Sequence, residues 1–310
     1  MLVSPGILFK DCYAKYGIAA VNIWSMEQVL ALFKAGEKAQ SPFIVQTTPV
    51  ARNYAGQQML LSMIRTASET YPEIHYAIHL DHGNEEHILS AIDSGGYTSV
   101  MIDASHDPFE KNMKRTKAVV ERAHDRGIEV EAELGVISGV EDNISTIRSK
   151  YTQPGMVEEF VHQTKCDSLA IAVGTSHGAY KFSGGEGLQF DILREIQEKL
   201  PGFPLVLHGG SAVNSQEITR INKAGGQLKT GAKGVDPKEL QEAIKYGICK
   251  VNIATDARLI WTRVHREFFQ ESPEQIDSIP PGTTYMQALE KFIIDKFELL
   301  GSNGKMVKNL

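Results

Sequence analysis

The sequence predicts an α/β protein that folds as a closed (β/α)₈ barrel, one domain over residues 1–310 with extra helices at its carboxyl end. Two observations support this prediction. Eight short apolar runs rich in β-branched residues alternate with segments of helical period, which is typical of parallel strands joined by crossover helices. The turn after the first run, Asn22-Ile23-Trp24-Ser25, lacks glycine, whereas an open dinucleotide-binding sheet has a glycine-rich turn there.

The expected elements follow one another without a linker. The strands are predicted at Ile18–Ile23, Phe43–Gln46, His75–Leu80, Ser99–Ile102, Glu129–Leu134, Ser168–Val173, Pro204–Leu207 and Lys250–Ile253. The helices are predicted at Met26–Lys38, Gly56–Glu69, Glu85–Asp93, Pro108–Arg126, Pro154–Gln163, Gln189–Leu200, Pro237–Tyr246, Thr255–Gln270 and Tyr285–Leu300. Pro280-Pro281-Gly282 is expected to break the chain before the last helix.

Three glycine-rich segments interrupt this alternation. Residues 135–150 are rich in Gly, Ser, Asp and Asn and are expected to form a mobile loop. Residues 179–187 follow the sixth strand, and residues 224–236 are expected to separate two short helices. Long loops in a compact domain are usually functional or disordered.

Composition excludes several classes of protein. Hydrophobic residues make up 42% of the chain, and the net charge is −6 with no basic cluster for nucleic acid or an anionic membrane. The cysteines, Cys12, Cys166 and Cys249, are too few and too far apart for a disulfide framework. No secretory signal and no run of eighteen apolar residues is present. We therefore expect a soluble cytoplasmic protein.

Histidines and acids cluster at the predicted carboxyl ends of the strands, where side chains of a barrel face one common mouth. His82, His177 and His208 each follow a different strand, and three imidazoles with an open position form the ligand set of catalytic zinc. The alternative is that each histidine only caps a strand or bonds a loop carbonyl. The convergence of three of them beside acids favours a metal site.

Acidic residues at the same mouth suit proton transfer or metal binding. Asp81 adjoins a predicted ligand, and a general acid or base near the ion must be a residue other than the ligands. The alternative for Asp81 is a cap on the helix that begins near Glu85. Asp103 and Glu133 are alternative metal ligands, groups that orient the histidines, or ordinary carboxylates at strand ends, and the residues do not decide among these.

A phosphate site is predicted after the seventh and eighth strands, where barrels commonly bind phosphate through glycine amides, hydroxyls and a helix amino end. The residues at this place are Gly209, Gly210 and Ser211, followed by Asn252, Ile253, Ala254 and Thr255. Lys181 is a candidate for an added positive charge, although most lysines are only solvated surface.

The strings HLDHG, SVMIDASHDPFEKN, EVEAELG, GTSHGAYK, LVLHGGS and KVNIATD resemble the signature segments of class II fructose-bisphosphate aldolases and the related tagatose-bisphosphate aldolases. The similarity runs in order through nearly the whole chain. It implies a (β/α)₈ barrel that performs a metal-dependent, reversible aldol cleavage of fructose 1,6-bisphosphate to dihydroxyacetone phosphate and glyceraldehyde 3-phosphate.

The resemblance also assigns roles to individual residues. It implies that His82, His177 and His208 hold zinc and that Asp81 moves the proton at the C4 oxygen of the substrate. It places a second or alternative divalent-ion site at Asp103 and Glu133, contacts to dihydroxyacetone phosphate at Gly178, Gly209–Ser211 and Asn252–Thr255, and a mobile-loop acid for the C3 proton at Glu141. A monovalent cation, Na⁺ or K⁺, and a homodimer or homotetramer are implied as well.

Departures from the family pattern concern the far end of the substrate. The turn after the second strand reads Thr47-Thr48-Pro49-Val50 instead of Ser-Glu-Gly, so that a hydroxyl remains at Thr48. Met286 stands about where many relatives have an arginine for the second phosphate, and losing a bidentate contact is not a conservative change. Arg258, Arg263 and Arg52 are candidate substitutes.

Four alternatives therefore remain open. The nearest is the same reaction on tagatose 1,6-bisphosphate or with another aldehyde partner. The others are a metal-dependent barrel hydrolase, a sugar-phosphate binder without turnover, and a Schiff-base aldolase that uses Lys250.

Overall fold

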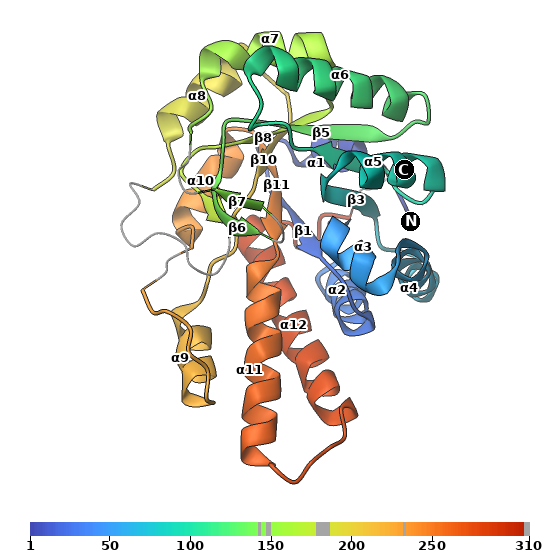
Figure 1. Cartoon of the computed structure of the whole chain (residues 1–310), viewed down its shortest axis with the longest axis vertical. Helices are drawn as coiled ribbons and strands as arrows, with labels where there is room; N and C mark the ends of the chain where they lie inside the picture. The colour runs from blue at the N-terminus through green and yellow to red at the C-terminus, as the bar shows by residue number, and fades with distance from the viewer. Residues whose placement is uncertain (142–143, 147–149, 178–186, 232–233, 307–310) are drawn as a thin grey trace.

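The chain forms a closed barrel of eight parallel strands surrounded by helices (Figure 1). The computed structural model describes residues 1–141, 144–146, 150–177, 187–231 and 234–306, with the backbone alone at 138–141, 144–146 and 177. The order around the barrel is β1-β11-β10-β8-β5-β4-β3-β2, and β2 pairs with β1 to close it. The predicted fold class is confirmed.

Each predicted strand overlaps one strand of the barrel. The bounds are β1 Ile18–Asn22, β2 Phe43–Thr47, β3 Tyr76–Gly83, β4 Ser99–Ile102, β5 Glu129–Leu134, β8 Ser168–Ile171, β10 Leu205–Leu207 and β11 Ile248–Ile253. The largest difference is at β3, which continues to Gly83 through a shift of register after Leu80 instead of ending at Leu80. This shift changes where the residues after Leu80 lie.

The helices also follow the predicted order. Their bounds are α1 Pro5–Cys12, α2 Met26–Ala39, α3 Pro49–Ala55, α4 Gln57–Thr70, α5 Glu85–Ser94, α6 Phe109–His124, α7 Pro154–Thr164, α8 Phe190–Lys199, α9 Ser215–Lys223, α10 Pro237–Lys245, α11 Thr255–Glu271 and α12 Ile279–Leu300. The short helices α1 and α3 were not predicted. The two short helices expected around residues 224–236 are α9 and α10.

The expected break at Pro280-Pro281-Gly282 is wrong. Helix α12 begins at Ile279 and contains all three residues in its first turn. Proline fits there because the first backbone N–H groups of a helix have no partner within the helix. The same arrangement begins α3, where Pro49 follows Thr48 and the Thr48 side chain accepts a hydrogen bond from Ala51 N.

A small second sheet occupies part of the segment 135–150 that was expected to be a loop. Strand β6 (Ser138–Glu141) pairs antiparallel with β7 (Ile144–Thr146) and parallel with β9 (Ser176–His177). These strands follow β5 and β8, so the sheet lies toward the carboxyl end of the barrel, the end that carries the predicted site.

Helix α1 covers the amino end of the barrel. Its side chains Leu8, Phe9 and Cys12 pack with Ile18 of β1 and Ile44 of β2 in one buried apolar cluster. At about 25 cal/mol per Å² of apolar surface removed from water, this packing stabilises the barrel from the end that carries no predicted site residue.

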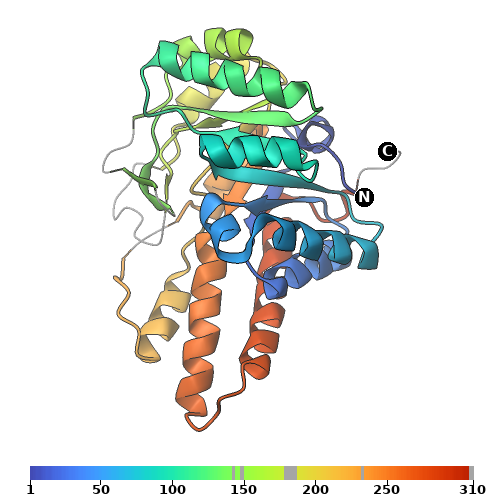
Figure 2. The same cartoon turned by 45° about the vertical axis from the view of Figure 1, so that its right-hand side comes forward.

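At the other extreme of the molecule, α11 and α12 project beyond the barrel as a long hairpin that ends at the tip near residues 272–278 (Figures 1 and 2). Helix α12 also packs along α2 on the outside of the barrel. Among the described residues, no helix has the length and apolar character needed to span a membrane.

Candidate active site at the carboxyl end of the barrel

The structure brings together two of the three predicted metal ligands. His82 lies at the end of β3 and His208 directly follows β10, and their ring centroids are 4.7 Å apart. His82 Nε2 lies 2.9 Å from His208 Nδ1. Nitrogens that share a tetrahedral zinc at about 2.1 Å lie roughly 3.4 Å apart, so a small adjustment would admit the ion.

The backbone at His82 is strained. Its φ is +46°, in the left-handed region that residues other than glycine seldom adopt. The register of β3 shifts between Leu80 and Gly83, the segment that contains His82. Strain of this kind persists only where the surrounding structure imposes it, and it clusters at functional sites.

Four other predicted site residues, the metal ligand His177, the mobile-loop acid Glu141 and the substrate contacts Gly178 and Lys181, are described only in part or not at all. His177 is the second residue of β9 and Glu141 is the last residue of β6, and only their backbones are described. Gly178 and Lys181 lie outside the described residues. The roles of these four residues therefore stay predictions.

Asp81 is completely buried and held by amides on both sides. Asn22 Nδ2 donates to Asp81 Oδ2 at 3.0 Å, and Asn252 Nδ2 donates to Asp81 Oδ1 at 3.1 Å. Gln46 Nε2 donates in turn to Asn22 Oδ1 at 2.6 Å and so orients the Asn22 amide. This hydrogen-bonded row joins β2, β1, β3 and β11 and fixes the carboxylate at the barrel mouth.

The alternative in which Asp81 caps the following helix is wrong. Helix α5 is capped by Asn84, whose side chain accepts a hydrogen bond from His87 N. Asp81 instead lies within β3, where Asn22 and Asn252 hold its carboxylate.

Asp103 and Glu133 form a second cluster with His82, in which one ligand atom of each lies within 4.8 Å of the others. Asp103 Oδ2 lies 3.6 Å from His82 Nδ1. Burial would raise the pKa of Asp103, but its contact with His82 and the hydrogen bonds from Ser105 outweigh burial and lower it. Burial, and then the charge of Asp103, raise the pKa of Glu133 well above its usual range. Glu133 Oε2 has no hydrogen-bond partner among the described residues.

His208 contacts Glu131, a residue that the sequence analysis did not identify as part of the site. Its Nε2 lies 2.8 Å from Glu131 Oε1 on β5. Burial lowers the pKa of His208, which favours the neutral ring that a metal requires. Burial alone would raise the pKa of Glu131, but the Lys250 ammonium, His79 and the hydrogen bond with His208 together outweigh it and lower that pKa. The signal for Glu131 was its inclusion in a buried strand, where a charged residue needs a partner.

The predicted phosphate segments touch each other. Ala254 N, at the start of α11, donates to Ser211 Oγ at 3.4 Å. A side chain on Gly209 would lie 2.5 Å from Ser176 O, and its φ of +65° also favours glycine. Asp256 accepts hydrogen bonds from Ala212 N and Val213 N, both at 2.9 Å, and so holds this turn against the amino end of a 17-residue helix.

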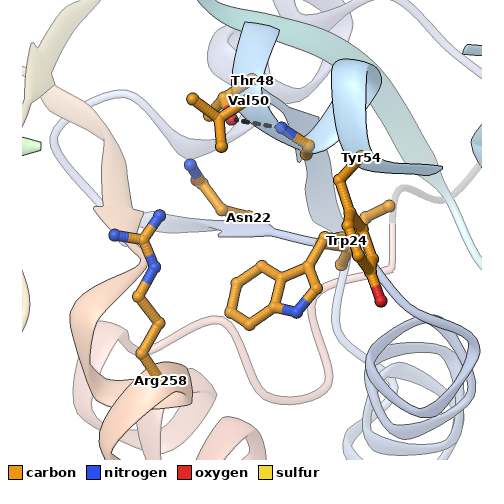
Figure 3. Close-up of a pocket in the computed structure, with 8 residues that line it drawn as sticks. Asn22, Trp24, Thr48, Val50, Tyr54 and Arg258 are labelled. Atoms are coloured by element: carbon orange, nitrogen blue, oxygen red, sulfur yellow. Dashed lines mark hydrogen bonds between the residues drawn. The ribbon is translucent and has the colours of Figure 1, made fainter. Parts of the chain in front are cut away.

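A cavity of about 350 Å³ opens beside Asn22 (Figure 3). Figure 3 shows Arg258 of α11 with its guanidinium group near Asn22 and the Trp24 indole. The Arg258 guanidinium carbon lies 5.6 Å from the centroid of the Trp24 ring. The remaining wall is formed by Ile23, Thr48, Val50, Ala51 and Tyr54. Since Asn22 also contacts Asp81, the cavity adjoins the candidate catalytic carboxylate.

The other two candidate arginines, Arg52 and Arg263, form hydrogen bonds away from the cavity. Arg52 donates to His87 O at 2.7 Å and to Ser90 Oγ at 2.9 Å, so it joins α3 to α5. Arg263 Nε donates to Glu217 Oε2 at 2.5 Å. Of the three, Arg258 is the arginine that lines the cavity.

Comparison with known proteins shows similarity over almost the whole chain. A family model described as fructose-bisphosphate aldolase class-II matches residues 7–305. The chain is 41% identical to a fructose-bisphosphate aldolase of Helicobacter pylori over 99% of this chain and 100% of the relative. It is 40% identical to a fructose-bisphosphate aldolase of Giardia intestinalis, over 94% of this chain and 90% of the relative. The crystal structure of the YdjI aldolase from Escherichia coli K12 is similar with a TM-score of 0.77 and 28% identity, covering 99% of this chain and 100% of that one.

Proposed function

Because the chain belongs to the class II fructose-bisphosphate aldolase family, we propose that the barrel mouth cleaves fructose 1,6-bisphosphate between C3 and C4 with the residues described above. The observation that carries this proposal is the meeting of a fixed carboxylate, Asp81, with the paired imidazoles of His82 and His208. The reaction is a lyase reaction that also runs in the direction of condensation.

The donor set fits a divalent ion, and zinc is the ion that we propose. Two facing imidazole nitrogens and nearby carboxylates match its usual ligands, and His177 is the proposed third imidazole. When bound, the ion supplies a Lewis acid for the negative charge left on the triose. Asp103 lies on the Nδ1 side of His82 and is proposed to orient that ring. Glu133, with its free carboxylate oxygen, is the proposed alternative ligand or second-ion site.

Asp81 is the proposed acid and base at the C4 oxygen. In the cleavage direction its carboxylate takes the proton of the C4 hydroxyl, and in condensation it returns that proton. Asn22 and Asn252 hold one carboxylate oxygen each, so that Asp81 does not need to reorganise during the reaction. Glu141 remains the proposed acid for the C3 proton.

The two phosphates of the substrate are assigned to the two sides of Asp81. We place the triose phosphate at the Gly209–Ser211 turn and the amino end of α11, where the helix dipole favours an anion. The far half of the sugar is assigned to the cavity of Figure 3, with Arg258 and Thr48 as the groups that face it. In this assignment Arg258 compensates for the methionine at position 286.

The experiment that tests this function is a coupled triose-phosphate assay on fructose and tagatose 1,6-bisphosphates. We expect activity on fructose 1,6-bisphosphate, its loss with a chelator and its return with zinc. A higher kcat/KM for the tagatose sugar would replace the substrate assignment. Activity that survives chelation and is destroyed by borohydride in the presence of substrate would overturn the metal mechanism in favour of a lysine Schiff base.

A homo-oligomer is proposed because apolar side chains gather on the projecting hairpin. Trp261 and Phe269 on α11, Ile276 at the tip and Ile279 at the start of α12 are all exposed, Ile276 by 97%. A second copy of the chain would cover them. Light scattering should give at least twice the chain mass, and Ile276→Asp with Ile279→Asp should lower it. Met59→Asp, at an exposed methionine on α4, is the matched control. A wild-type monomer would contradict the proposal.

Location in the cytoplasm is proposed as well. The three cysteines are free and buried, which suits a reducing compartment.

A further inference from the structure

Lys250 is a buried charge to which the proposed reaction gives no role. It lies in β11, its side chain is 1% exposed, and Nζ is 2.6 Å from Glu131 Oε2 on β5. Strands β11 and β5 are not neighbours, since β10 and β8 lie between them, so this ion pair crosses the interior of the barrel. An ammonium group paired in this way is not available as a Schiff-base amine.

The two oxygens of Glu131 have different partners. Oε2 accepts from Lys250, and Oε1 lies 2.8 Å from His208 Nε2. A carboxylate can only accept hydrogen bonds, so the proton of the His208 ring is on Nε2. The lone pair of the neutral ring is then on Nδ1, the atom that faces His82 Nε2 at 2.9 Å. This is the orientation that a metal ligand needs.

His79 does not substitute for Lys250 in this cluster. His79 Nε2 is 3.5 Å from Glu131 Oε2, and its Nδ1 is 2.7 Å from Ser99 Oγ. Burial, followed by the charge of Lys250, lowers the pKa of His79 to about 3. Among the described residues, Lys250 is therefore the cation that fixes the Glu131 carboxylate.

We infer that Lys250 and Glu131 are positioning residues of the metal centre. Lys250 fixes one oxygen of Glu131, and the other oxygen fixes the His208 ring with Nδ1 toward the ion. This inference rests on the proposed function, because His208 is the proposed ligand. It assigns to a residue deep in the barrel an effect on metal affinity, although Lys250 contacts neither the ion nor the substrate.

The chemistry of glutamine makes the inference testable. In Glu131→Gln, the single amide oxygen is attracted to the Lys250 ammonium, since charge-assisted hydrogen bonds are the stronger ones. The amide NH₂ then faces His208 Nε2 and requires the lone pair there, which moves the ring proton to Nδ1. In the double variant Glu131→Gln with Lys250→Met, the amide is free to turn its oxygen back to His208.

The experiment is a zinc titration of the full chain in competition with a chromophoric chelator. We expect Lys250→Met and Glu131→Gln each to raise the zinc Kd about 10–100-fold. The double variant should bind zinc more tightly than Glu131→Gln alone. A buried pair that only stabilises the fold predicts the opposite order, with the double variant no tighter than either single one.

Two control variants separate the inference from general effects of buried charge. Glu129→Gln makes the same change two residues earlier on β5, where the carboxylate instead accepts from Gly6 N. Lys296→Met removes another buried lysine, which lies 3.9 Å from Asp256. Both should keep the wild-type Kd. Thermal unfolding of each metal-free variant shows that it is folded, and if Lys250→Met fails to fold, the comparison of Glu131→Gln with the double variant still decides.

The outcomes also separate this inference from the proposed function. A wild-type chain that binds no zinc would overturn the proposed metal centre. A wild-type chain that binds zinc, with an unchanged Kd in Lys250→Met or a double variant weaker than Glu131→Gln, would overturn the positioning role alone.

Discussion

The two ends of the barrel use buried residues in opposite ways. At the amino end, α1 packs Leu8 and Phe9 onto apolar strand residues such as Ile18. At the carboxyl end, Asp81 and His208 are buried just as completely, yet both are polar and are held by hydrogen bonds from other strands. The comparison teaches that apolar packing stabilises the frame at one end, and this frame imposes a polar and strained arrangement at the other.

The largest expected effect comes from breaking the polar end at a proposed metal ligand. His208→Ala should lose bound zinc and lower kcat/KM by more than about 10⁴-fold, because both the ion and the group that holds it are removed. Metal analysis and the triose-phosphate assay measure the two losses. His162→Ala, at an exposed histidine on α7, is the control. Zinc retained at wild-type affinity in His208→Ala would remove it from the ligand set.

The next effect separates proton transfer from metal binding. Asp81→Ala should keep the zinc but lower kcat by about 10²–10⁴-fold, the usual contribution of a general acid or base. The measurement is kcat on metal-loaded protein of known zinc content. Normal turnover in this variant would refute the role of Asp81.

The amino end should respond in the opposite way. Leu8→Ala removes a fully buried side chain, so we expect the free energy of unfolding to fall by about 2–5 kcal/mol. Because α1 lies at the other end of the strands, kcat/KM at 25 °C should stay within about twofold of wild type. Denaturant titration measures the first quantity. A large loss of kcat/KM in folded Leu8→Ala would show that the two ends are coupled.

The smallest effect is a pH dependence that comes from His79. Its native pKa of about 3 lies below the ordinary 6.5, so between these pH values the unfolded chain binds a proton that the native protein does not. The free energy of unfolding therefore falls as pH falls through this window, by at most about 1.4 kcal/mol per pH unit for one proton. In metal-free His79→Asn the decline between pH 6.5 and 4.5 should be less steep. Equal slopes in wild type and variant would contradict the native pKa.

The sequence predicted the barrel, and the end where the candidate site residues gather, because both follow from local patterns. Apolar runs with intervening helical periods specify the strands, and residues after each run face the mouth whatever their detailed register. This is why Asp81, His82 and His208 could be placed together although they are far apart in the chain.

Other features depend on contacts that no local pattern contains. The pairing of Glu131 with Lys250 joins residues 119 positions apart across the barrel and depends on the register of four strands. Asn84, and not Asp81, caps α5 because β3 continues to Gly83. The start of α12 depends on proline being tolerated in a first turn, where sequence reasoning expected a break.

The central claim is that folding gathers His82 and His208 around one divalent ion. The most direct measurement is an anomalous difference map at the zinc absorption edge from crystals of zinc-loaded protein. The account predicts a strong peak about 2.0–2.1 Å from both His82 Nε2 and His208 Nδ1. A zinc peak elsewhere in the chain, with these two nitrogens still in contact with each other, would contradict it.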